Sequence, residues 1–280
     1  MRLGAQVFVN SSDPEIIAKA HRELGYRAAY CPEVSLSDKK RIAQIREAFA
    51  KHAVVIAEVG VWNNLMDPDE EKRRANLEAM KEGLTLAEEI GALCLVNIAG
   101  SFNPTNWAGP HPDNLSQKAF DLAVSNAREV IDAVKPKQAK FTYEMMPFCL
   151  PHNADANLEL IEAVDRPAFG VHMDAVNLIN SVEACFDSTP VIVDCFAKLG
   201  PHIAACHLKD IKLDETALTP RFDEVMPGEG WFDLATYLKE IERLPHQPPT
   251  MIEHLKTKEE FAQAREYVMG LGRKIGIGFE

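Results

Sequence analysis

Two short apolar runs, Ala53-Val54-Val55-Ile56-Ala57 and Leu93-Cys94-Leu95-Val96, show how this chain is built. Neither run alternates apolar with polar residues, as a strand with one solvated face would. Continuous runs of this length are typical of strands buried on both faces of a parallel sheet. Eight such runs follow one another along the chain, at residues 3–9, 26–31, 53–60, 93–98, 138–145, 168–174, 202–208 and 249–254.

The segments between these runs carry helix signals. Asp13-Pro14 and Asp67-Pro68 each join an N-cap residue to a proline suited to the first helical position. Glu70 follows Asp67 at the spacing of a capping box, and Gly91 can end the helix that begins there. The sequence therefore predicts strands and helices in strict alternation.

Eight strand–helix units in 280 residues give 280/8 = 35 residues per unit, a comfortable length for a βα repeat. Alternating units of this kind form a parallel sheet with right-handed crossovers, and a count of eight favours a closed barrel over an open sheet. We expect an α/β protein with one (β/α)8 domain over residues 1–280. Its active site should lie at the carboxyl ends of the strands.

The composition narrows the class of protein. The chain has 42 acidic and 30 basic residues, a formal net charge of −12, and 46% hydrophobic residues. This balance is that of a soluble globular protein, and the acidity argues against a nucleic-acid partner, which needs a basic surface. No apolar run approaches the ~20 residues of a membrane span, and the first ten residues do not resemble a signal peptide. The sequence therefore predicts no membrane partner.

The six cysteines form no C-x-x-C pair, and several lie in apolar runs. We expect them to be reduced and structural, which favours a cytoplasmic location. The sequence leaves a homo-oligomer open.

Four successive apolar runs end in side chains that bind metals or transfer protons. These are Glu144, Asp174, His207 and Glu253. Their spacings are 174−144 = 30, 207−174 = 33 and 253−207 = 46 residues, each about one repeat, and a long loop from Asp210 to Glu229 stretches the last. Three neighbouring carboxylates repel one another unless a cation offsets them. Carboxylates with one imidazole suit Mn²⁺ or Mg²⁺, with Zn²⁺ or Co²⁺ as alternatives.

Three further polar residues lie at or near the ends of predicted strands and are candidate substrate contacts. Glu58 ends the third strand, where it could position substrate or form a salt bridge. Asn97 ends the fourth strand, where it could bind a hydroxyl or cap its loop. His172 shares a strand face with Asp174 and could contact substrate, support the site or pack in the core.

Aromatic and amide groups are frequent in the loops that should lie above this rim, around Trp62 and Trp107. Such groups can stack on a sugar face while binding hydroxyls, and we count Trp107 as a substrate contact. The alternative is that both tryptophans only pack their loops onto the barrel. Few cations accompany them, which favours an unphosphorylated substrate.

Five segments, taken together and in order, resemble the xylose isomerase-like TIM-barrel superfamily. The closest resemblance is to its sugar phosphate isomerase/epimerase group, which includes ketose 3-epimerases and inosose dehydratases. The segments are Thr142-Tyr143-Glu144-Met145-Met146-Pro147, Val171-His172-Met173-Asp174-Ala175-Val176-Asn177, His207-Leu208-Lys209-Asp210, Pro227-Gly228-Glu229-Gly230 and Ile252-Glu253-His254.

The resemblance implies one divalent metal bound by Glu144, Asp174, His207 and Glu253. It also implies that Glu144 and Glu253 act as an acid–base pair on opposite sides of a ketose or related polyol. One removes the proton next to the carbonyl, the metal stabilises a cis-enediolate, and a proton returns from the other face. A carbonyl on a cation makes the neighbouring C–H acidic, so this chemistry is physically consistent.

The chain departs from the epimerase pattern at three positions. Asn177 stands where the epimerases have a histidine, Leu150 where they have a second glutamate, and Leu213 where they have an arginine. Lys209 and Arg221 could replace the missing polar groups, so we count them, with Asn177, as candidate substrate contacts.

Other reactions follow from the same resemblance. A lyase or dehydratase acting on a keto-inositol or keto-glycoside would begin with the same proton removal and end with loss of a leaving group. An apurinic endonuclease shares the fold, but its three-zinc site needs more histidines, and Asn177 and the net charge of −12 speak against it. A binding barrel without catalysis is the remaining alternative.

Overall fold

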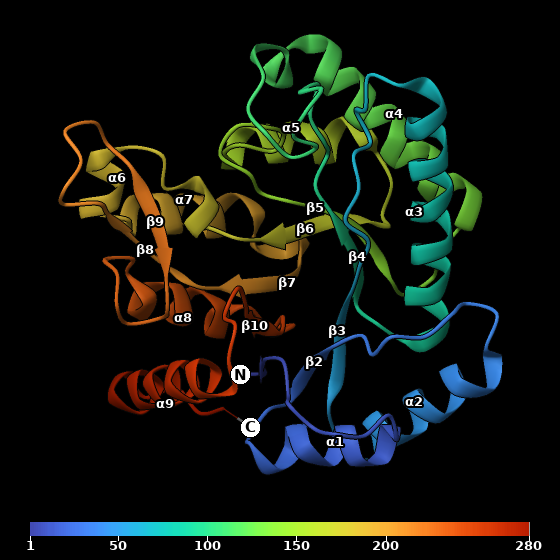
Figure 1. Cartoon of the computed structure of the whole chain (residues 1–280), viewed down its shortest axis with the longest axis vertical. Coiled ribbons are helices and arrows are strands. Elements are labelled where there is room, and N and C mark those ends of the chain that lie inside the picture. The colour runs from blue at the N-terminus through green and yellow to red at the C-terminus, as the bar shows by residue number, and fades with distance from the viewer. Residues whose placement is uncertain (280) are drawn as a thin grey trace.

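Eight parallel strands close into a barrel with helices on the outside (Figure 1). The computed structural model describes residues 1–279. The order around the barrel is β1-β10-β7-β6-β5-β4-β3-β2, which confirms the predicted (β/α)8 class. The strands are β1 (Leu3–Gly4), β2 (Ala28–Tyr30), β3 (Val55–Gly60), β4 (Cys94–Asn97), β5 (Lys140–Glu144), β6 (Phe169–Met173), β7 (Ile203–Leu208) and β10 (Thr250–Ile252).

The helices form a ring around the strands. They are α1 (Pro14–Glu23), α2 (Lys39–Lys51), α3 (Glu70–Ile90), α4 (Gln117–Val134), α5 (Ala154–Val164), α6 (Val182–Phe186), α7 (Thr189–Leu199), α8 (Leu234–Arg243) and α9 (Lys258–Ile275). Short 3-10 turns lie at η1 (Pro112–Leu115), η2 (Val176–Leu178) and η3 (Gly200–His202). Among residues 1–279, no helix combines the length and the apolar character that crossing a bilayer would require.

The helix signals in the sequence are confirmed at α1 but misplaced at α3. Asp13 caps α1, with Pro14 as its first residue. For α3 the expected start at Asp67-Pro68 is wrong: Asp69 is the N-cap, and its side chain accepts the backbone N–H groups of Glu71 and Lys72. Asp67 instead accepts the N–H of Asp69, so it forms the turn that precedes the cap.

The connection after β7 is also more ordered than expected. Where the sequence suggests only a long loop, the chain forms an antiparallel hairpin of β8 (Asp210–Leu213) and β9 (Phe222–Val225). The hairpin lies beside α6 at the left of Figure 1.

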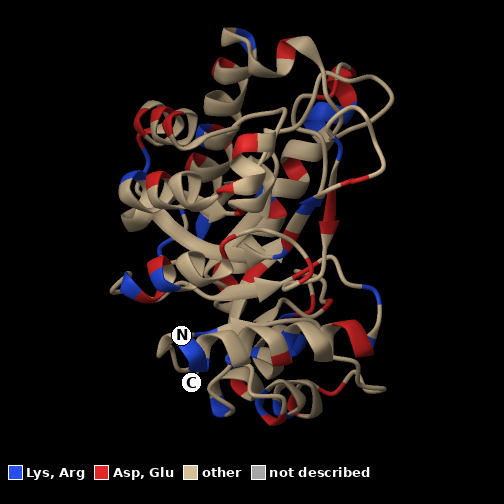
Figure 2. Cartoon of the chain, turned by 90° about the vertical axis from the view of Figure 1, so that its left-hand side faces the viewer, with Lys and Arg blue, Asp and Glu red and all other residues tan. Residues whose placement is uncertain are grey.

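The main core lies between the strands and the helix ring. Outward-facing strand residues such as Leu95, Phe141, Val171 and Cys206 pack against the helices in two large clusters. On the side of the molecule seen in Figure 2, acidic and basic residues are interspersed over the helices. Because the outward strand faces pack in the core, the inward faces are left to carry the polar site.

Candidate metal centre

Four neighbouring strands bring Glu144, Asp174, His207 and Glu253 together. Glu144 ends β5, Asp174 directly follows β6, His207 lies in β7 and Glu253 directly follows β10. These strands are consecutive in the barrel order, so their carboxyl ends form one continuous arc. One ligand atom from each of the four side chains lies within 4.8 Å of the others, and all four residues are buried.

Strand alternation explains why these side chains point inward. Val171 and Met173 pack in the outer core, so His172 and Asp174 face the barrel interior. Cys206 and Leu208 likewise pack outward, which leaves His207 on the inner face with Lys209 beyond it.

His207 lies at the centre of the carboxylates. Its Nδ1 atom is 2.8 Å from Glu144 Oε1, 2.9 Å from Glu253 Oε2 and 3.8 Å from Asp174 Oδ2. A single imidazole nitrogen therefore faces all three acidic members of the group. This is the arrangement in which four donors can share one cation.

Lys209 lies on the other side of two of these carboxylates. Its Nζ atom is 2.8 Å from both Asp174 Oδ2 and Glu253 Oε1, and 3.3 Å from Glu224 Oε2. The two close distances are ion pairs without good hydrogen-bond angles, since both oxygens are buried and lack a hydrogen-bond partner. Lys209 is 2% exposed, so it contacts the candidate ligands rather than open solvent.

Burial and the charges of neighbouring side chains shift the pKa values of Asp174, Glu144 and His207. Burial raises the pKa of Asp174 to about 8, because the charges of Glu253 and Glu144 add to the cost of removing it from water. Burial also disfavours the charged form of Glu144, but the charge and hydrogen bond of His207 outweigh it and lower the pKa. Burial opposes protonation of His207, but three carboxylates hold its pKa well above the usual range.

The donor set fits a divalent cation. Four buried carboxylates, those of Glu58, Glu144, Asp174 and Glu253, lie together, and the cationic or titratable groups beside them are Lys209 and the imidazoles of His172, His207 and His254. Asp174 Oδ2 and Glu253 Oε1 are buried acceptors without a hydrogen bond. Oxygen donors with one imidazole are the ligands that Mn²⁺ and Mg²⁺ accept.

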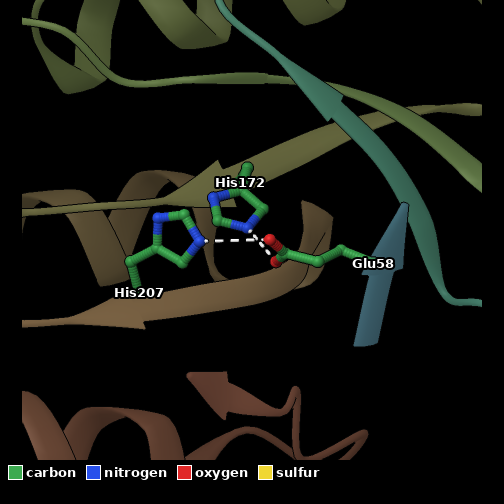
Figure 3. A group of neighbouring side chains, drawn as sticks. All are labelled: Glu58, His172 and His207. Carbon is green, nitrogen blue, oxygen red and sulfur yellow. Dashed lines mark hydrogen bonds and ion pairs between the residues drawn. The ribbon is translucent and has the colours of Figure 1, made fainter. Parts of the chain in front are cut away.

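A second group, Glu58 and His172, shares His207 with the first. Glu58 Oε2 is 2.7 Å from His172 Nε2, and Glu58 Oε1 is 3.2 Å from His207 Nε2 (Figure 3). Burial disfavours the Glu58 carboxylate, yet the two histidines lower its pKa to about 2. Both predicted substrate contacts, Glu58 and His172, thus have partners inside the protein.

Asn97 does not reach the site. It lies on the same strand face as Leu95, which packs in the outer core, and its amide is 3.5 Å from Met80 Sδ in α3. The amide also donates to the Asn63 carbonyl. Asn97 therefore caps its loop, the alternative that the sequence left open, because strand alternation turns it away from the interior.

The other three predicted substrate contacts lie at different distances from the group. Asn177 is next to it: its N–H donates to Asp174 Oδ1, and its side chain donates to the Met145 carbonyl. Trp107 is 42% exposed in the loop between β4 and η1. Arg221 pairs with Asp214 and Asp223 at the hairpin, so the structure does not bring it to the group.

Two residues at the site, Glu224 and Tyr30, were not predicted from the sequence. Glu224 lies in β9 and reaches both Lys209 and His254, whose Nδ1 atom is 2.7 Å away. The Tyr30 hydroxyl donates to the Ile252 carbonyl, next to Glu253. The strand Phe222-Asp223-Glu224-Val225 shows no alternation of apolar and polar residues, and the contact of Glu224 with Lys209 depends on how the hairpin folds back.

Comparison of the sequence with models of known protein families identifies the family of this chain. The model of the family described as xylose isomerase-like TIM barrel matches residues 18–270. The chain belongs to this family. Among curated proteins, none matches the chain in sequence.

Solved structures of this xylose isomerase-like fold superpose on the chain over nearly its whole length. D-psicose 3-epimerase with D-tagatose from Clostridium cellulolyticum H10 has a TM-score of 0.70 at 14% identity, covering 99% of this chain and 100% of that one. The probable 3-DHS dehydratase AsbF from Bacillus anthracis has a TM-score of 0.70 at 15% identity, covering 97% and 98%.

A third structure was solved with a metal. It is a xylose isomerase-like TIM barrel protein from Mycobacterium smegmatis in complex with magnesium, with a TM-score of 0.66 at 18% identity, covering 98% of this chain and 97% of that one. At these identities the likeness establishes the shared fold. The fold thus includes an epimerase, a probable dehydratase and a magnesium complex.

Proposed function

We propose that this xylose isomerase-like protein is a divalent-metal-dependent isomerase or epimerase of a ketose or related polyol. Glu144, Asp174, His207 and Glu253 would hold the cation. The observation that carries the proposal is the exposure of the two glutamates at the ends of the arc. Glu144 is 6% and Glu253 7% exposed, whereas Asp174 is 0% and His207 2%. The outer carboxylates are therefore the ones a substrate can meet.

The two glutamates have the placement that proton transfer requires. When bound, a divalent cation supplies the positive charge that makes a C–H beside a carbonyl acidic. Glu144 and Glu253 come from strands separated by β6 and β7, so they approach the opening from different sides. One carboxylate can accept the proton and the other can return one, provided each lies within hydrogen-bond reach of the substrate carbon.

A cavity of about 360 Å³ borders one side of the group, where His207 and Glu253 line it together with Glu58, and its volume is within the size range of small-ligand pockets. Its lining includes His207, Glu253, Tyr30 and Trp62, whose indole could stack on a sugar ring. A larger cavity of about 750 Å³ lies between residues 31–39 and α3. We assign the substrate to the smaller cavity, because His207 and the carboxylates of Glu253 and Glu58 line it, whereas none of them lines the larger one.

Lys209 supports a second candidate function, that of a lyase or dehydratase. Its ammonium group lies 2.8 Å from Glu253 Oε1, inside the proposed acid–base site. An ammonium at this place could protonate a leaving group after Glu144 or Glu253 has removed the first proton. The fold it shares with a probable dehydratase is consistent with this alternative.

Incubation of the Mn²⁺-loaded protein with ketoses, inososes and keto-glycosides in D₂O tests both functions. Deuterium beside the carbonyl without loss of water supports the isomerase or epimerase. A new α,β-unsaturated or diketone product supports the lyase. Glu144→Gln and Glu253→Gln should each abolish the exchange, whereas Glu88→Gln, whose carboxylate contacts Gln138 and Ala139 before the start of β5, should keep it. Absence of exchange and of product across these substrates would contradict both functions.

A further inference from the structure

We propose that Glu58 is a positioning residue for His207. Its carboxylate holds the imidazole by Nε2 and so keeps Nδ1 directed at the carboxylates of the candidate metal centre. The inference rests on the proposed function, because it concerns the same cation. It adds a residue outside the four-donor group, from the far side of the barrel.

The contacts around His207 divide cleanly between its two nitrogens. Nδ1 faces Glu144 and Glu253 at 2.8 and 2.9 Å, and Nε2 faces Glu58 Oε1 at 3.2 Å. A carboxylate that accepts the N–H of one ring nitrogen leaves the lone pair of the other nitrogen for a metal. It also fixes the ring orientation and makes the imidazole a stronger donor.

Glu58 is itself held in place by His172. The other carboxylate oxygen, Oε2, lies 2.7 Å from His172 Nε2 (Figure 3). The two rings meet edge to face with their centroids 4.1 Å apart. Glu58 is 2% and His172 0% exposed, so solvent does not compete for these contacts. The Glu58 side chain thus has both oxygens engaged and little freedom to turn away from His207.

An irregularity in β3 is what directs Glu58 inward. Ala29 pairs with Ile56 but Tyr30 pairs with Glu58, so Ala57 is an extra residue in the strand. Such a bulge reverses the alternation of side chains beyond it. As a result Val59 packs in the outer core and Glu58 points to the histidines. Without the bulge, Glu58 would face the helix ring.

Two other roles for Glu58 are less well supported. As a substrate contact it would have to give up one of two buried hydrogen bonds. As a ligand of a second cation with His172 and His207, it would require His207 to serve two ions through opposite nitrogens. The distances of 2.7 and 3.2 Å are those of hydrogen bonds, which favours the positioning role.

Metal affinity tests the inference without an activity assay. The free-Mn²⁺ signal in electron paramagnetic resonance gives the dissociation constant and the number of bound ions. Glu58→Leu, which removes both hydrogen bonds at similar volume, should raise the dissociation constant by about 10–100-fold. Glu58→Gln should raise it less, because the amide oxygen can still accept from Nε2. Glu88→Gln, which alters a carboxylate that accepts the N–H groups of Gln138 and Ala139, is the matched control and should leave it unchanged.

The outcomes separate the two proposals. If Glu144→Gln loses Mn²⁺ while Glu58→Leu binds it within twofold of the parent, the positioning role is wrong and the metal site stands. If Glu144→Gln binds Mn²⁺ as the parent does, the proposed metal site itself fails. Two ions per chain in the parent, with one lost in Glu58→Leu, would make Glu58 a ligand.

A second measurement covers the case in which Glu58→Leu does not fold. In proton–nitrogen-15 spectra of histidine-labelled, Mg²⁺-loaded protein, the Nε2–H proton of His207 should resonate downfield, because a carboxylate accepts it. Glu58→Gln replaces the carboxylate by a weaker amide acceptor and should move this resonance upfield. An unchanged resonance in that folded variant would overturn the positioning role.

Discussion

At the scale of single residues, Asp210 shows how one buried carboxylate can organise a loop. Its Oδ1 accepts the N–H groups of Ile211 and Phe232, and its Oδ2 accepts those of Gly228 and Gly230, all at 2.8–3.1 Å. The residue is 1% exposed. The Pro-Gly-Glu-Gly segment noticed in the sequence is therefore tied to the carboxyl end of β7, beside the candidate metal centre.

Asp210→Asn should destabilise the protein by about 3 kcal/mol, because an amide has one acceptor oxygen and would turn a donor toward buried N–H groups. Urea unfolding would measure this loss. Asp223→Asn, at a half-exposed residue paired with Arg221, is the matched control and should change stability by less than about 0.5 kcal/mol. Equal effects of the two substitutions would show that the four backbone contacts contribute little.

At the scale of elements, the start of α3 offers a direct comparison of two aspartates. Asp69→Ala should cost about 1 kcal/mol, because it removes the acceptor for the N–H groups of Glu71 and Lys72. Asp67→Ala removes only the acceptor for Asp69 N–H in the preceding turn, so its cost should be smaller. Chemical denaturation of both variants decides the order. A larger loss for Asp67→Ala would mean that the helix begins where the sequence first suggested.

The strands and helices themselves could be predicted from the sequence. The bulge in β3 and the direction in which Asn97 points could not. Each apolar run marks a strand because burial on both faces leaves a continuous signal. The bulge at Ala57 has no such signal, since its extra residue is itself apolar, yet it decides that Glu58 points inward. Asn97 is the opposite case, a polar residue at a strand end that points away from the barrel interior. It ends its strand as Glu144 does, but alternation from Leu95 turns it toward α3.

At the scale of the whole molecule, the barrel order makes the four-residue group foreseeable. Neighbouring repeats in the chain become neighbouring strands, so polar residues that end successive strands must meet at one rim. The sequence alone therefore predicts that Glu144, Asp174, His207 and Glu253 lie near one another, and the structure brings them together. It could not place Arg221 or Glu224, because their positions depend on a hairpin outside the barrel.

The group of four residues leads to a prediction for Asp174→Asn, in which the Tm of the metal-free protein is kept or raised while metal binding is weakened. Without a cation, burial and the charges of Glu253 and Glu144 raise the pKa of Asp174 to about 8 despite the opposing charge of Lys209, so the neutral form of this side chain is favoured more than in an ordinary aspartate. Asp174→Asn imitates this neutral form. We therefore expect the metal-free variant to melt at or above the Tm of the metal-free parent.

Addition of Mn²⁺ at 100 times its dissociation constant should stabilise the parent by about 2.7 kcal/mol, because the ion binds the folded state alone. Asp174→Asn removes one proposed ligand and should lose most of that rise, whereas Glu88→Gln should keep it. Differential scanning calorimetry with EDTA or with excess Mn²⁺ measures the Tm of the parent and of both variants in each condition. A variant that melts well below the metal-free parent and still gains the full metal-dependent rise would show that Asp174 is needed for folding and not for the cation.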